Sequence, residues 1–186
     1  MAVPTSSRAA AEAWEIDGGH TSVTFKVRHF FAPVIGRFTQ SSGTLMYDAA
    51  NPTASTIEFV IPAASINTDN DKRDEHLRGD DFFNTAQYPN ITFKSTKLEK
   101  GEGEGKFKVT GNLTIRDVTK PVTLMVESLG FGPNAWGGET GGFSVTGEIN
   151  RQDFGVKWNK ALDNGGTVLG DNVKIDIGVE VAKKKA

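Results

Sequence analysis

Three histidines, His20, His29 and His76, are the side chains of this sequence that are best suited to acid–base or metal chemistry. The chain has no cysteine, so a zinc site would need all three histidines to converge. Neither a His-x-x-x-His pair nor an HExxH motif is present. We therefore predict no metal site, and His20 and His29 remain candidates for the acid–base groups of an enzyme.

Acidic residues are dense between positions 69 and 81. Asp69-Asn-Asp71 begins like a calcium loop, but Arg73 and Asp74 then stand where the loop needs a ligand and a glycine. The two carboxylates of a glycosidase face each other across a cleft, whereas these acids share one short segment with Lys72 and Arg78. We interpret them as a solvated, salt-bridged helix face. No nucleophile elbow, P-loop or dinucleotide fingerprint is present, and we predict no catalytic residues and no cofactor.

Composition narrows the class of protein further. The 186 residues carry 21 Lys+Arg against 23 Asp+Glu, a balance that argues against a nucleic-acid partner. No apolar run approaches the roughly 20 residues of a membrane helix, so we expect no transmembrane segment. Residues 1–13 lack the apolar core of a signal peptide. We expect a cytoplasmic protein as the sequence stands, and a periplasmic or secreted one if a signal peptide has been removed.

Alternation of apolar and polar residues dominates the chain, as expected of strands with one buried face. It predicts eight strands, near residues 22–28, 37–47, 56–61, 91–98, 106–115, 122–126, 143–149 and 173–181, with bulges in the second and fourth. A helix is predicted over 69–78, because a capping pattern begins at Thr68 and Gly79 follows. The fold class is therefore all-β, an eight-stranded antiparallel barrel or sandwich with one short helix after the third strand.

Several ordered motifs resemble one known family. They are Trp14-Glu-Ile-Asp17 with His20-Thr-Ser-Val-Thr-Phe25, Gly36-Arg37-Phe38, Ser65-Ile-Asn-Thr68 with Arg73-Asp-Glu-His-Leu-Arg78, Asp81-Phe-Phe83, Val118-Thr-Lys-Pro-Val122, Asn150-Arg-Gln-Asp-Phe-Gly155 and Gly170-Asp-Asn-Val173. The series, from about Trp14 to Val181, is similar to the YceI-like family of bacterial lipocalin-like, polyisoprenoid-binding proteins. The resemblance implies an extended barrel, a long apolar tunnel for an isoprenoid-type chain, frequent homodimers and no catalytic apparatus.

We therefore expect residues 1–13 to be disordered, residues 14–182 to form one barrel domain, and residues 183–186 to be a solvated basic tail. The expected function is binding, and storage or transport, of a long apolar lipid such as a polyisoprenoid or an isoprenoid quinone. The alternation supplies the lining candidates Phe25, Val27, Phe38, Phe59, Ile61, Phe93, Phe107, Val109, Leu113, Ile115, Val145 and Ile177. Phe82, Phe83 and Trp158 are candidates for gating a mouth, and His20, Arg28 and His29 for holding a polar headgroup.

Two alternatives stay open, because periodicity does not distinguish a hollow barrel from one filled by its own side chains. One is an enzyme that acts on a lipid or a small apolar substrate, with His20 or His29 as the acid or base. The other is a stress-linked interaction module whose barrel is solid. The solid barrel would have no tunnel and no bound lipid.

Overall fold

In a computed structural model of the protein, residues 10–185 are described. Strands dominate, and they are β1 Glu12–Ile16, β2 Ser22–His29, β3 Ala32–Phe38, β4 Ser42–Tyr47, β5 Thr56–Pro62, β6 Ile66–Asn67, β7 Asn90–Lys100, β8 Lys106–Ile115, β9 Val118–Pro133, β10 Glu139–Asn150 and β11 Leu169–Lys183. The one α-helix among these residues is α1, Asp71–Arg78, and three short 3-10 turns are Pro52–Ala54, Ala63–Ser65 and Arg151–Phe154.

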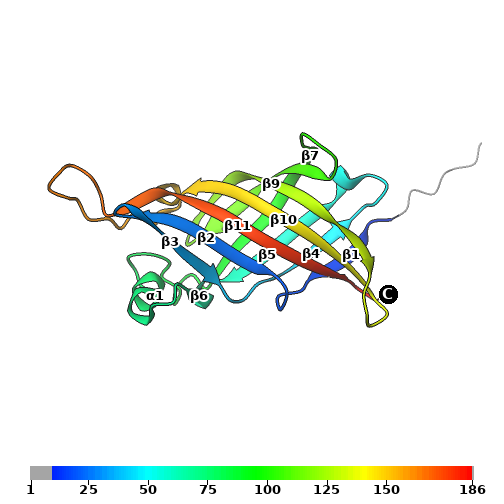
Figure 1. Cartoon of the computed structure of the whole chain (residues 1–186), viewed down its shortest axis with the longest axis horizontal. Helices are drawn as coiled ribbons and strands as arrows, with labels where there is room; N and C mark the ends of the chain where they lie inside the picture. The colour runs from blue at the N-terminus through cyan, green and yellow to red at the C-terminus, as the bar shows by residue number, and fades with distance from the viewer. Residues whose placement is uncertain (1–9, 186) are drawn as a thin grey trace, which may run out of the picture.

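Eight of the strands close a barrel. Each strand pairs with the next in the order β1-β4-β5-β7-β8-β9-β10-β11, and β11 pairs back with β1 through Ile16↔Val181. Every pairing is antiparallel. The expected eight-stranded antiparallel barrel is confirmed, and Figure 1 shows that it is strongly elongated along the strands.

Two interruptions within barrel strands, together with the two-residue strand β6 beside β3, explain why the number of strands exceeds eight. β1 and β2 follow one another along the same edge of β11, separated by residues 17–21, and β3 and β4 likewise face β2 and β1. The strand expected over 37–47 therefore begins earlier, at Ala32, and is interrupted at residues 39–41 rather than bulged. The irregularity expected within 91–98 is present between Ser95 and Lys97.

Helix α1 forms where a capping residue and acidic first-turn residues meet. The Asn70 side chain caps it by accepting a hydrogen bond from the Arg73 amide at 2.9 Å, and Asp71 and Asp74 lie in the first turn. Gly79 ends it, as the sequence predicts. Figure 1 places α1 and β6 at one end of the barrel, where the long connection before β11 also projects, whereas the β9–β10 turn and the C-terminus lie at the other.

The sheet extends beyond the expected domain at both ends. Glu12 and Ala13 belong to β1, where they pair with Tyr47 and Met46, and residues 1–9 lie outside the described residues. Lys183 belongs to β11 and faces Trp14 in the pairing. Lys183 is therefore part of the sheet rather than of a solvated tail, and the Lys184 amide that follows it donates to the Ala13 carbonyl of β1 at 2.9 Å.

Candidate functional site

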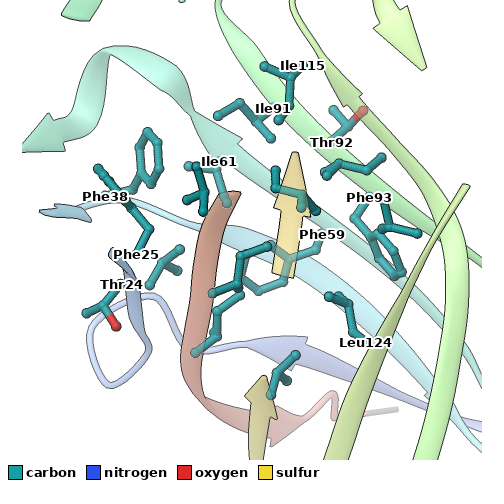
Figure 2. A pocket seen from close by; sticks show the side chains of 18 of the residues that line it. Thr24, Phe25, Phe38, Phe59, Ile61, Ile91, Thr92, Phe93, Ile115 and Leu124 are labelled. Carbon is teal, nitrogen blue, oxygen red and sulfur yellow. The ribbon is translucent and has the colours of Figure 1, made fainter. Parts of the chain in front are cut away.

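The barrel encloses a cavity of about 460 Å³. Alternate residues of every barrel strand point into it, so its wall is almost entirely aliphatic and aromatic, as Figure 2 shows for Phe59, Ile61 and Phe93 around the shared space. Every lining candidate from the sequence borders this cavity, namely Phe25, Val27, Phe38, Phe59, Ile61, Phe93, Phe107, Val109, Leu113, Ile115, Val145 and Ile177, and so do Phe82, Phe83 and Trp158. Their contact with a lipid stays a prediction.

The burial of the wall residues shows that the barrel is hollow. In a packed core, inward side chains lose nearly all contact with solvent. Here the inward residues of β10 and β11, such as Val145, Ile149 and Ile177, remain only half-buried although they face the barrel axis. A solid barrel is therefore not what the structure shows.

Glycines on the inner face let large side chains lie flat against the wall. A Cβ atom on Gly36 would come within 2.3 Å of the Phe25 ring, and one on Gly147 within 2.5 Å of the Leu124 side chain. Neither glycine has a positive φ, so the requirement comes from the neighbouring side chain and not from the backbone. By occupying the space above a glycine, each large side chain leaves the barrel axis open.

One end of the barrel is plugged by aromatic rings. Phe131 stacks on Tyr47 with ring centroids 4.6 Å apart and meets Trp14 edge-on at 5.0 Å. Trp14 is 2% exposed and packs with Leu45 and Val181 in a separate buried cluster. Lys183 covers this end, since its ammonium group lies over the Trp14 ring. We call this group of residues the aromatic plug.

The opposite end, beside α1, is where the cavity opens. Among the described residues that line the cavity, those that are mainly exposed are His29, Arg73 and His76, and they come from the end of β2 and from α1. His76 lies edge-on to Trp158 at 5.3 Å, and its Nε2 is 2.7 Å from the Asp81 carboxylate. The mouth therefore has a polar and aromatic rim, whereas the wall behind it is apolar.

Arginine side chains hold this rim together by donating hydrogen bonds to backbone carbonyls. Arg151 is 5% exposed and donates to the carbonyls of Gly170, Val156 and Trp158, each at 2.8 Å. Burial lowers the pKa of its guanidinium, and the carboxylate of Asp171, 3.3 Å away, opposes that shift. The network fixes the positions of Val156 and Trp158 on the cavity wall.

Helix α1 is docked onto residues 64–68 in a similar way. Arg73 donates to the hydroxyl and the carbonyl of Thr68, both at 2.7 Å, and Arg78 donates to the carbonyls of Ala64 and Ile66. Asp74 is buried and accepts from the amide and hydroxyl of Thr68. The interpretation of the acidic segment as a wholly solvated helix face is therefore wrong at Asp74.

The three residues expected to hold a headgroup are not brought together. His29 lines the mouth of the cavity. Arg28 points outward, where it donates to the carbonyls of Phe30 and Thr167 at 2.6 and 3.1 Å. His20 lies outside the barrel in the break between β1 and β2, so the structure places neither His20 nor Arg28 on the cavity.

His20 is instead part of an exposed ionic cluster. Its Nδ1 lies 2.8 Å from Asp17 and 3.9 Å from Glu180. The hydrogen bond between His20 and Asp17 lowers the pKa of Asp17 and raises the pKa of His20. These three side chains have the atom types and spacing of metal ligands, but their mutual ion pairs explain the arrangement, and we assign no metal to it.

Comparison with known proteins agrees with this architecture. The YceI-like domain family matches residues 14–181. The chain belongs to the YceI-like family. A UPF0312 protein of Shewanella sp. strain W3-18-1 is 38% identical over 185 residues, covering 99% of this chain and 93% of that protein.

Solved YceI-like structures share the fold. BcnA of Burkholderia cenocepacia superposes with a TM-score of 0.77 at 25% identity, covering 89% of this chain and 98% of that one. The YceI protein of Campylobacter jejuni gives 0.71 at 34% identity, covering 83% and 88%. A polyisoprenoid binding domain from Saccharophagus degradans gives 0.66 at 19% identity, covering 93% and 99%, a likeness of fold alone.

The family assignment points to a binding protein rather than an enzyme. Among residues 10–185, no helix is long and apolar enough to cross a membrane.

Proposed function

We propose that this YceI-like protein binds a long apolar lipid, of the polyisoprenoid or isoprenoid-quinone type, inside its barrel and stores or transports it. The observation that carries the proposal is the cavity of about 460 Å³ with an almost wholly apolar wall. Cavities of roughly 300–1,000 Å³ are typical of small-molecule sites. A structural neighbour is named a polyisoprenoid binding domain, which is consistent with the proposal through the shared fold.

The chemistry of the wall favours a chain over a compact polar ligand. Each buried methylene contributes about 0.8 kcal/mol, so several isoprene units bind tightly without strong polar contacts. The polar side chains on the lining lie mainly at the mouth, where His29, Arg73 and His76 leave room for a polar end group. The enzyme alternative loses one of its two candidate acid–base groups, because His20 pairs with Asp17 outside the barrel and only His29 of the two lines the cavity.

Two variants one residue apart on β10 test the proposal. Val145 faces the cavity, whereas Thr146 points to the outer face and is exposed. Val145→Trp fills the lumen and should weaken uptake of an added isoprenoid quinone by about a hundredfold, the equivalent of three to four buried methylenes. Thr146→Trp is the matched control and should bind like the wild type. Equal binding by both variants would contradict the proposal.

The homodimer stays a prediction.

A further inference from the structure

The turn between β2 and β3 carries two exposed phenylalanines at the mouth of the cavity. His29 pairs with Ala32, so Phe30 and Phe31 form a two-residue hairpin loop. Phe31 is 94% exposed, which makes it the most exposed large apolar side chain among the described residues, and Phe30 is 42% exposed. The adjoining residue His29 lines the mouth.

This turn departs from what its geometry favours. Two-residue hairpin loops prefer Asn or Gly, because a positive φ is easiest for those residues. Phe30 instead adopts a φ of 50°, a conformation that is unusual for a bulky residue. The Phe30 ring meets the His29 ring edge-on at 4.8 Å, whereas Phe31 is almost fully exposed at a water-facing turn, so its presence there points to an apolar partner.

The connection that lies beside the hairpin tip carries two lysines, Lys157 and Lys160. The Phe30 amide donates to the Val168 carbonyl at 2.8 Å, and the Val168 amide donates to the Lys160 carbonyl at 3.0 Å, so the segment around Lys160 lies next to the tip. Lys157 and Lys160 are exposed and form no ion pair within residues 10–185, and Asp163 is the single acid between 157 and 168. Figure 1 shows this connection projecting beyond the α1 end of the barrel.

We infer that the hairpin tip Phe30–Phe31, with Lys157 and Lys160, docks on a lipid membrane that carries anionic headgroups. Exposed aromatic side chains beside lysines are the combination that binds the interface of an anionic bilayer. Docking sets the mouth of the cavity against the lipid, so that an apolar chain passes between membrane and lumen without crossing water. This role in loading rests on the proposed function, but the docking itself is measurable without a bound chain.

Co-sedimentation of the full chain with lipid vesicles tests the inference. We expect binding to vesicles of phosphatidylcholine with a minority of phosphatidylglycerol, and weaker binding to pure phosphatidylcholine. Phe31→Ser should weaken partitioning onto the vesicles by about tenfold. The double variant Lys157→Gln/Lys160→Gln should weaken it by about fivefold for each lysine removed. Trp136→Ser is the matched control, because Trp136 is 85% exposed and belongs to the β9–β10 turn at the opposite end.

The outcomes separate docking from lipid carriage. Val145→Trp, which blocks the lumen, should still bind vesicles as the wild type does. Wild-type protein that takes up isoprenoid quinone yet ignores anionic vesicles would overturn the inference and leave the proposed function standing. A result in which Trp136→Ser abolishes binding and Phe31→Ser does not would also overturn it. So would a self-association that Phe31→Ser removes in the absence of any vesicle binding, because the partner of the tip would then be a second copy of the chain.

Discussion

The two ends of the barrel are built by different interactions. The end near the C-terminus is closed by ring packing, where Trp14, Tyr47 and Phe131 form the aromatic plug. The α1 end is assembled by arginine side chains that donate to backbone carbonyls, with Arg151 the most buried of them. Ring packing fills the end near the C-terminus with side chains. Arginine-to-carbonyl bonds fix irregular segments around an opening without filling it, so the difference explains how one barrel is packed at one end and open at the other.

Truncating a tryptophan at each end should give the largest contrast. Trp14→Ala removes a fully buried ring and is expected to lower the free energy of unfolding by about 3–5 kcal/mol. Trp158→Ala should cost about 1–2 kcal/mol, because Trp158 is only half-buried at the mouth and faces a cavity on one side. Urea unfolding of the two variants provides the comparison. A larger loss for Trp158→Ala would mean that the α1 end, and not the plug, is the packed end.

A pair of arginines at the α1 end sharpens the account of the rim. Arg151→Ala leaves the buried carbonyls of Val156 and Trp158 unpaired and should cost about 2–4 kcal/mol. Arg28→Ala is the matched control, since the exposed Arg28 also donates to two carbonyls but water replaces it, and the cost should stay below about 1 kcal/mol. Similar unfolding free energies for both variants would show that the buried network does not hold the rim.

Glycine substitutions on the inner wall should affect stability at one end and binding at the other. A methyl group on Gly141 overlaps the Phe131 ring, so Gly141→Ala disturbs the aromatic plug and is expected to cost about 1–3 kcal/mol. Gly36→Ala instead pushes the Phe25 ring into free lumen. We expect the free energy of unfolding to change by less than about 1 kcal/mol. The affinity for the quinone should fall about tenfold, because the displaced ring takes the space of about two methylene groups of the bound chain. The reverse pattern, in urea unfolding and binding titrations, would contradict the flat-ring description of the wall.

The smallest expected effect concerns His20, which lies on the outside between the two ends. Asp17 raises the pKa of His20 above 6.5, while His20 lowers that of Asp17 below 3.8. The His20 contribution to stability is therefore lost as pH rises through its folded pKa, and the Asp17 contribution is lost as pH falls through its folded pKa. A histidine NMR titration should give a folded pKa above 6.5, and Asp17→Asn should return it toward that value. A folded pKa at or below 6.5 would show that the pair does not form.

Much of the wall could be predicted from the sequence, because alternation fixes which residues face inward. Phe25 and Val27 face the cavity, and alternate residues of a strand share one face. His29 therefore also points inward, and Arg28 points outward. The same rule therefore argues against Arg28 as a headgroup ligand. His20 precedes the strand, so no periodicity bears on it.

The rest of the site depends on how distant segments pack together. Arg73 and His76 reach the mouth only because α1 docks on residues 64–68, and Arg151 becomes buried only because the chain folds back over it. Local pattern carries no signal for these contacts. The sequence carries one signal for a hollow barrel, the inward-facing glycines Gly36 and Gly147. That signal can be interpreted only once the large side chains opposite these glycines are known.

The measurement that tests the central claim most directly is organic extraction of the freshly purified protein followed by mass spectrometry, with Val145→Trp and Thr146→Trp in parallel. The account predicts a stoichiometric polyprenyl, quinone or other long apolar species from the wild type and from Thr146→Trp, and its loss from Val145→Trp. An empty wild-type extract, together with no uptake of added isoprenoid quinone, would contradict lipid carriage and leave a hollow barrel without a cargo.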